Sequence, residues 1–207
     1  MKIGVALSGC DAGGLSAYTV LEYLEDRGYD IEMVSASCVP VAAAMMYTCG
    51  FDAQRAQKST AAFFNKFHTS DTDSVIDAIS QNFTRDELKN NKKAAVNAVN
   101  VTDGRIITFT NAFSLDTQKI RSYPLDDAYD ALSATISPMD GLGSYRYKDT
   151  KLCDFSVWYG CPLFPLKMSG IEKIVSIAFL PAVPDTPYEV LVKQVTESNA
   201  QTADAHV

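Results

Sequence analysis

The side chains that could do chemistry in this chain are thiols and carboxylates, because imidazoles are scarce. Two histidines occur among the 207 residues, His68 and His206, and the second is the penultimate residue. A reaction that needs several imidazoles is therefore hard to build here. Five cysteines and 25 Asp and Glu residues remain as candidates for nucleophiles, bases and ligands.

The most informative thiol, Cys38, lies between an expected strand and an expected helix. Ile31–Ala36 is typical of a buried strand, and the apolar segment Val41–Tyr47 is typical of a buried helix. A nucleophile on such an elbow stands above the sheet, at the positive end of the helix dipole, which favours the thiolate form of a cysteine. The plainer interpretation is that Cys38 is a small apolar residue that fills the core.

A second turn, Gly9 to Gly14, joins the expected strand Ile3–Leu7 to a helix that ends at Gly28. Its backbone N–H groups could bind an anion at the start of that helix. As a dinucleotide fingerprint the turn is poor, because Asp11 stands where the middle glycine belongs and would oppose a pyrophosphate. The turn is therefore either an anion-binding turn of another kind or a simple connection.

The elements that must position these turns alternate between strands and helices, which predicts a mainly parallel sheet covered by helices. Asp103-Gly104 predicts a hairpin. We expect a single domain over residues 1–207, with a frayed tail over 200–207. The further elements expected are a helix over Ala53–Phe67, hairpin strands over Ala94–Val101 and Arg105–Thr110, strands over Lys151–Asp154 and Lys173–Phe179, and a helix over Tyr188–Ser198.

Composition excludes several classes of function. The net charge of −7 argues against nucleic acid as a partner, because binding to phosphates needs clusters of Lys and Arg. No apolar stretch approaches the length of a transmembrane segment, and the N-terminus lacks the pattern of a signal peptide. The odd number of cysteines then predicts reduced thiols in a cytoplasmic protein.

The two turns and their spacing resemble the patatin-like phospholipases. The resemblance runs without a gap over Gly4–Gly50, which includes both turns and both of their helices. Ser133–Pro138 resembles the segment before the family's last catalytic strand, and Cys153-Asp154 resembles its Asp-Gly-Gly/Ala block. The resemblance implies a three-layer α/β/α fold with a mainly parallel central sheet.

It also implies a catalytic dyad without histidine, in which Cys38 is the nucleophile and Asp154 is the base. The implied substrate is a lipid or another acyl ester, with no metal or cofactor, and contact with a membrane surface would be peripheral. The resemblance places the oxyanion hole at the backbone of Gly9, Cys10, Asp11 and Val39.

Departures from the family pattern leave two alternatives open. The usual Gly-x-Ser-x-Gly elbow is replaced by 36–40, Ala-Ser-Cys-Val-Pro, and Pro40 is expected to push Val39 away from helical geometry. The chain could therefore be a pseudoenzyme that keeps the fold for binding or regulation. In the other alternative, Cys10, Cys38 and Cys153 surround one crevice and form a metal or redox site.

Overall fold

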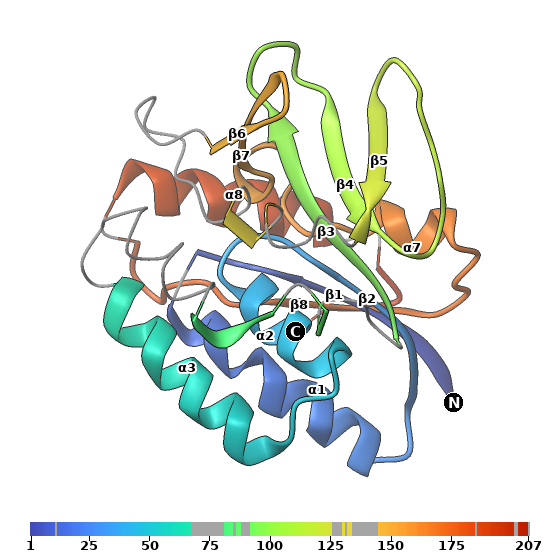
Figure 1. Ribbon diagram of the computed structural model, residues 1–207, viewed down its shortest axis with the longest axis vertical. Coiled ribbons are helices and arrows are strands. Elements are labelled where there is room, and N and C mark those ends of the chain that lie inside the picture. Colours follow the sequence, from blue (N-terminus) through green and yellow to red (C-terminus); the bar gives the residue numbers. More distant parts are fainter. Residues whose placement is uncertain are drawn as a thin grey trace.

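Helices cover both faces of one sheet in the computed structural model of the chain (Figure 1). The structure describes residues 1–10, 12–67, 81–84, 86–87, 92–125, 130, 132–133, 145–184, 186–200 and 203–206. Within this part of the chain the three layers are helices, sheet and helices. The fold class expected from the sequence is thereby confirmed.

The main path of the sheet runs in the order β5-β4-β3-β2-β1-β8-β9. Strands β1, β2, β8 and β9 are parallel to their neighbours on this path, and β3 is parallel to β2 but antiparallel to β4 and β7. β6 pairs with β7 as a hairpin beside β3. The strands are β1 (Lys2–Ser8), β2 (Asp30–Ala36), β3 (Lys93–Asn100), β4 (Ile106–Thr110), β5 (Ile120–Pro124), β6 (Tyr145–Tyr147), β7 (Thr150–Asp154), β8 (Ile174–Ala178) and β9 (Ala205–His206).

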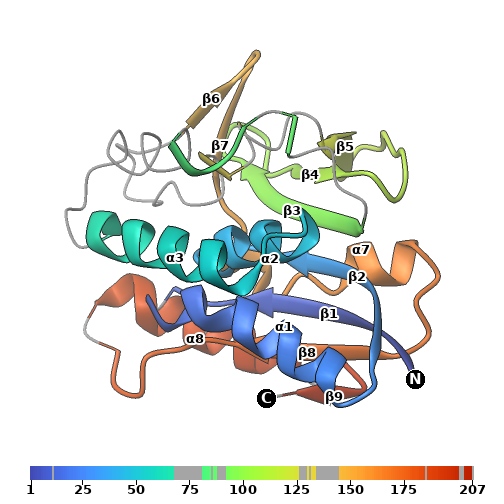
Figure 2. The ribbon, with the colours of Figure 1, turned by 60° about the horizontal axis from the view of Figure 1, so that its bottom comes forward.

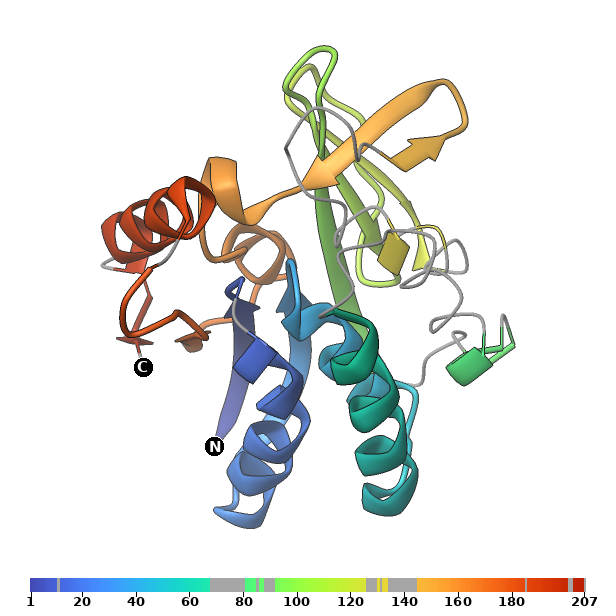
Figure 3. The same cartoon turned by 90° about the vertical axis from the view of Figure 1, so that its left-hand side faces the viewer.

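The helices fall into two groups, on opposite faces of the sheet (Figure 3). One face carries the 3-10 helix η1 (Ala12–Ser16), α1 (Ala17–Asp26), α2 (Pro40–Thr48) and α3 (Ala53–Phe67). The other face carries α7 (Phe164–Met168) and α8 (Pro187–Ala200), and α6 (Ser156–Tyr159) packs on α8. The turns after β1 and β2 therefore both lead to the same helical layer.

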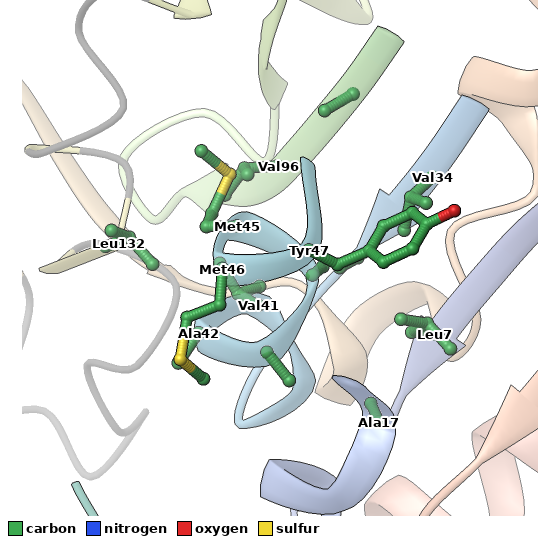
Figure 4. Close-up of a cluster of buried hydrophobic side chains, with 14 of the residues drawn as sticks. Leu7, Ala17, Val34, Val41, Ala42, Met45, Met46, Tyr47, Val96 and Leu132 are labelled. Atoms are coloured by element: carbon green, nitrogen blue, oxygen red, sulfur yellow. The ribbon is translucent and has the colours of Figure 1, made fainter. Parts of the chain in front are cut away.

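Helix α2 is the centre of the larger core cluster (Figure 4). All of its residues from Pro40 to Thr48 are buried, and Met45 and Met46 are fully enclosed. A helix that is apolar on every side must be surrounded by protein. This helix starts two residues after Cys38, so tight packing along its whole length fixes the position of the elbow.

The structure confirms most of the expected elements and adds a strand near the C-terminus. The residues of the expected frayed tail that the structure describes are ordered by pairing, because β9 adds to the sheet beside β8. The side chain of Asp204 accepts a hydrogen bond from the Ile174 amide at 2.8 Å, and its own amide donates to the Ile174 carbonyl. Fraying is therefore not what the described residues 203–206 show. Their polar sequence hid a strand that completes an edge of the sheet.

Candidate active site

Cys38 occupies a sharp turn between β2 and α2. Its backbone φ is +58°, in the left-handed region that residues with a side chain rarely adopt. Among the described residues other than glycine, Lys148 is the only further one with a positive φ. Such strain costs roughly 1–3 kcal/mol and clusters at functional sites, where the surrounding structure holds it in place. The backbone of Cys38 therefore has the conformation of a nucleophile elbow.

Close contacts with the first turn hold this elbow in place. The amide of Ser37 donates a hydrogen bond to the carbonyl of Leu7 at 3.1 Å, which ties the elbow to β1. A Cβ atom on Gly14 would lie 2.9 Å from the ring carbons of Pro40, so glycine lets η1 approach the start of α2. The two turns found in the sequence are thus packed against each other.

Val39 shows that one expectation about Pro40 was wrong. Its φ of −54° and ψ of −43° are helical, although the residue before a proline usually avoids this region. The reversal of the chain takes place at Cys38 instead, and the Pro40 ring is seated against Gly14. The Val39 amide therefore lies at the N-terminus of α2, where N–H groups have no acceptor within the helix.

Asp154 ends β7 opposite the end of β2. β3 pairs in parallel with β2 up to Ala36, which lies opposite Val96, and antiparallel with β7, where Asp154 lies opposite Ala98. Both partners lie on the same edge of β3, because β4 occupies its other edge. The carboxyl ends of β2 and β7 therefore meet about 7 Å apart along β3.

Asp154 also faces the helical layer that carries Cys38. Side chains alternate along β3, so Val96, Ala98 and their partners Ala36 and Asp154 share one face. Val96, Ala98 and Ala36 pack in the same core cluster as α2 and Cys38. Asp154 is 1% exposed and accepts a hydrogen bond from the Ser156 amide at 3.0 Å, while Cys38 is 6% exposed. Cys38 and Asp154 are thus both buried on the same side of the sheet, where β2 and β7 end.

Buried polar residues that the sequence did not single out support both halves of this site. The hydroxyl groups of Ser37 and Ser156 lie 2.9 Å apart and join the elbow to the turn after Asp154. Asn97 donates hydrogen bonds to the Ala36 carbonyl at 3.1 Å and to the Ser35 hydroxyl at 3.2 Å. Asn97, a polar residue in the middle of the otherwise apolar run 94–99, was the available signal for these contacts.

The first turn places a glycine where no other residue fits. Gly9 has a φ of +131°, and a Cβ atom there would lie 2.0 Å from the carbonyl oxygen of Phe179. Because Leu7 pairs with Ala36, the turn that begins at Gly9 lies beside the elbow. Cys10 is half-buried. Asp11, the remaining residue of the expected oxyanion turn, lies outside the described residues, as does His68.

The thiols do not form the expected three-cysteine site. Cys153 lies opposite Val99 and packs with Ile106 and Phe155 on the face of the sheet away from Cys38. Burial raises the pKa of Cys153 to about 11, which favours the protonated thiol at neutral pH. Over the described residues, no group of three or more His, Cys, Asp or Glu side chains is arranged to hold a metal ion. The shared crevice of Cys10, Cys38 and Cys153 was therefore a wrong prediction.

A groove of about 450 Å³ runs beside the first turn, between α1 and α3. This volume lies within the range of about 300–1,000 Å³ that is typical of small-molecule sites. One of its lining residues is Gly13, which precedes the glycine that packs on Pro40. Its lining combines apolar and polar residues and comprises Gly13, Leu15, Ser16, Tyr18, Thr19, Glu22, Ala53, Ala56, Gln57 and Thr60.

Comparison with known proteins relates this chain to others by its fold. Neither a protein-family model nor a curated protein matches the sequence. Among solved structures, that of VipD from Legionella pneumophila is similar, with a TM-score of 0.53 over 93% of this chain. The two sequences are 11% identical over the aligned part, and the chain spans 52% of the VipD chain, about half its length.

This similarity supports the patatin-like fold that the sequence resemblance implied. At 11% identity it describes the architecture of the sheet and its helices. No helix in the described ranges has the length and apolar character needed to cross a bilayer.

Proposed function

We propose that this chain is an acyl-ester hydrolase or acyltransferase that uses Cys38 as its nucleophile and Asp154 as its general base. The observation that supports it most is the backbone of Cys38, which is strained at φ +58° on the strand-to-helix turn opposite Asp154. A structural cysteine that only filled the core would have no need of this conformation. The substrate class is a lipid or another small acyl ester.

The first half of the reaction would form a thioester. The Cys38 sulfur attacks the ester carbonyl, and its proton passes to the Asp154 carboxylate. The C–O bond then breaks, and Asp154 returns that proton to the leaving alcohol. The acyl group remains on Cys38 as a thioester, a covalent intermediate of the kind that splits one difficult step into two easier ones.

The second half would transfer the acyl group onward. Asp154 takes the proton of an incoming water or alcohol as its oxygen attacks the thioester carbonyl. The C–S bond breaks, the proton returns to the Cys38 sulfur, and a carboxylic acid or a new ester leaves. In both steps the Asp154 carboxylate would carry the proton and the Cys38 sulfur would carry the acyl group, so the reaction would need no metal or cofactor.

Backbone amides would stabilise the oxyanion that forms in each half. The Val39 amide lies at the N-terminus of α2, and the turn after Gly9 lies beside it. Each well-aimed donor contributes about 2.7–4 kcal/mol to the barrier reduction. The groove between α1 and α3 would receive the acyl chain, since Gly13 of the first turn lines it together with the apolar residues Leu15 and Ala56.

A trapped intermediate tests this proposal directly. We expect p-nitrophenyl butyrate to acylate Cys38, and the Asp154→Asn variant to accumulate the thioester, because the nitrophenol leaves without a proton but deacylation needs the base. Intact-mass and peptide mass spectrometry would locate a butyryl group that hydroxylamine removes. Cys153→Ser should behave as the parent chain does, and Cys38→Ala should stay unmodified.

The same experiment separates the enzyme from the pseudoenzyme. A chain that turns over neither short nor long acyl esters, and carries no acyl group on Cys38 in either the parent or the Asp154→Asn protein, would be a binding protein with this fold. Acylation elsewhere, with Cys38→Ala still active, would show that the nucleophile has been assigned to the wrong residue.

A further inference from the structure

Positive charge gathers on one part of this acidic chain. Residues 101–125 and 145–151, which we name the basic lobe, contain β4, β5, β6 and the first two residues of β7. They carry six Lys and Arg side chains against three Asp, with Asp130 as a fourth carboxylate that accepts a hydrogen bond from Tyr145 of β6, whereas the whole chain has a net charge of −7. The six cations are Arg105, Lys119, Arg121, Arg146, Lys148 and Lys151.

The hairpin of β6 and β7 carries three of these cations and projects from the body of the molecule (Figure 2). Arg146 and Lys151 lie directly opposite each other across the hairpin, and both are exposed. Like charges in this position destabilise a strand pair. Within the described part of the chain, neither side chain forms an ion pair with a carboxylate. A like-charge pair that costs stability and meets no carboxylate among the described residues is better explained by an external anion.

Aromatic contacts fix this hairpin against the edge of the sheet. The Lys148 ammonium lies 4.6 Å from the ring centre of Tyr123 and 4.7 Å from that of Tyr147. The ring centres of Tyr123 and Tyr147 are 5.2 Å apart, and Phe109 packs edge-on against Tyr147. The hairpin is thereby held to β4 and β5, so its cations are presented by a rigid support.

The hairpin also leads straight to the candidate active site. Three residues after Lys151, β7 ends at Asp154, a separation of about 10 Å along an extended strand. On β5, Arg121 lies in the same cross-sheet row as Asp154, through Ile107 and Ala98. A large anionic surface that met the hairpin would therefore lie close to the dyad.

We propose that the basic lobe docks this chain on an anionic lipid surface, with Arg146, Lys148 and Lys151 as the principal contacts. The choice of lipid over other polyanions rests on the proposed function, because an enzyme for water-insoluble esters must meet its substrate at an interface. The charge distribution and the like-charge pair of Arg146 and Lys151 do not depend on that proposal. The free energy of binding to an anionic membrane grows in proportion to the number of clustered Lys and Arg side chains.

Vesicle binding tests the inference without any need for catalysis. The full-length chain with Cys38→Ala would be sedimented with vesicles of phosphatidylcholine, or of phosphatidylcholine with an equal part of phosphatidylglycerol. We expect binding to the second kind alone, weakening as salt is added. The double variant Arg146→Gln, Lys151→Gln should bind on the order of 30-fold more weakly. It should also unfold at a higher temperature, because the like-charge pair is gone.

Matched controls make the result decisive. The double variant Lys58→Gln, Lys167→Gln removes the same charge from exposed positions on α3 and α7 and should bind the vesicles as the parent does. Equal binding to both kinds of vesicle, equal binding by the hairpin variant, or tighter binding to a DNA duplex than to the vesicles would each overturn the inference. Turnover of p-nitrophenyl butyrate in solution should be unchanged in the hairpin variant, and its absence from every protein would overturn the proposed function alone.

Discussion

The hydroxyl of Ser37 lies 2.9 Å from the hydroxyl of Ser156, although the two residues are 119 positions apart in the chain. Ser37 immediately precedes the elbow residue Cys38, and Ser156 donates its amide to the carboxylate of Asp154. Both serines are completely buried. This hydrogen bond joins the two halves of the candidate dyad, so its energetics can be measured even before a substrate is known.

A double-mutant cycle should reveal that coupling. We expect Ser37→Ala and Ser156→Ala each to lower the free energy of unfolding by about 1–3 kcal/mol, because each leaves a buried hydroxyl without its partner. The double variant should lose less than the sum, by about 0.5 kcal/mol or more. Urea denaturation of the four proteins measures it. Strict additivity would mean that the two hydroxyls do not interact.

Replacement of Asp154 by asparagine should separate chemistry from folding. Asparagine keeps an oxygen that can accept the Ser156 amide proton, so we expect thermal unfolding to change by no more than a few degrees. Removal of the base should lower kcat/KM for acyl esters by roughly 10²–10⁴-fold. Asp149→Asn, an exposed change at the tip of the β6–β7 hairpin, is the control. Unchanged turnover in Asp154→Asn would remove Asp154 from the mechanism.

Glycine substitutions should distinguish the packed turns from an open one. Gly9→Ala drives a Cβ atom into the Phe179 carbonyl and should cost about 3 kcal/mol or more in stability. Gly28 also has a positive φ, but a Cβ atom there would meet nothing within 4 Å. We therefore expect Gly28→Ala to lower the free energy of unfolding by about 1–2 kcal/mol. Denaturation curves compare the two. A Gly9→Ala protein as stable as Gly28→Ala would contradict the close approach of the first turn to Phe179.

Gly14→Ala should affect the elbow more than the fold. Its Cβ atom would press on the Pro40 ring at 2.9 Å, and a ring can shift by a few tenths of an ångström. We expect a stability loss of about 1–3 kcal/mol, together with a larger loss of turnover than Gly28→Ala shows. Crystallography or steady-state kinetics would test this. Equal turnover in both variants would mean that the contact with Pro40 does not position Cys38.

Three thiols outside the site, the buried Cys153 and Cys161 and the half-buried Cys49, should be unreactive until the pH is high. Burial raises the pKa of Cys49 to about 12 and that of Cys161 to about 11, as it does for Cys153. At pH 8 in the folded chain, iodoacetamide should therefore modify these three far more slowly than in urea. Peptide mass spectrometry measures each site, and rapid native labelling of Cys161 would contradict its burial.

The same pKa shifts predict how stability depends on pH. A thiol whose pKa is raised by folding contributes stability that is complete below its unfolded value of 9.0 and is lost as pH rises toward about 11. The free energy of unfolding should therefore fall between pH 9.0 and 11. Cys153→Ala should reduce this dependence, and urea titrations at a series of pH values would measure the change.

The sequence by itself determined the local elements, because they depend on patterns of adjacent residues. Alternating apolar runs, glycine at helix ends and the Asp103-Gly104 turn gave β1, β2, α2, α3 and the β3–β4 hairpin close to their observed bounds. The buried helix after Cys38 and the strand before it were enough to predict an elbow. The strand β5 was missed, since its half-buried residues 120–124 have no strong apolar pattern.

Only the tertiary structure decided which residues meet. β2 and β7 are far apart in the chain, and no local pattern shows that both pair with one edge of β3. That pairing places Asp154 on the face of Cys38 and Cys153 on the opposite face, because successive side chains of a strand alternate. Tertiary packing also holds Cys38 at a positive φ, which residues with a side chain rarely adopt. Pairing with β8 likewise orders β9, although its local sequence does not indicate a strand.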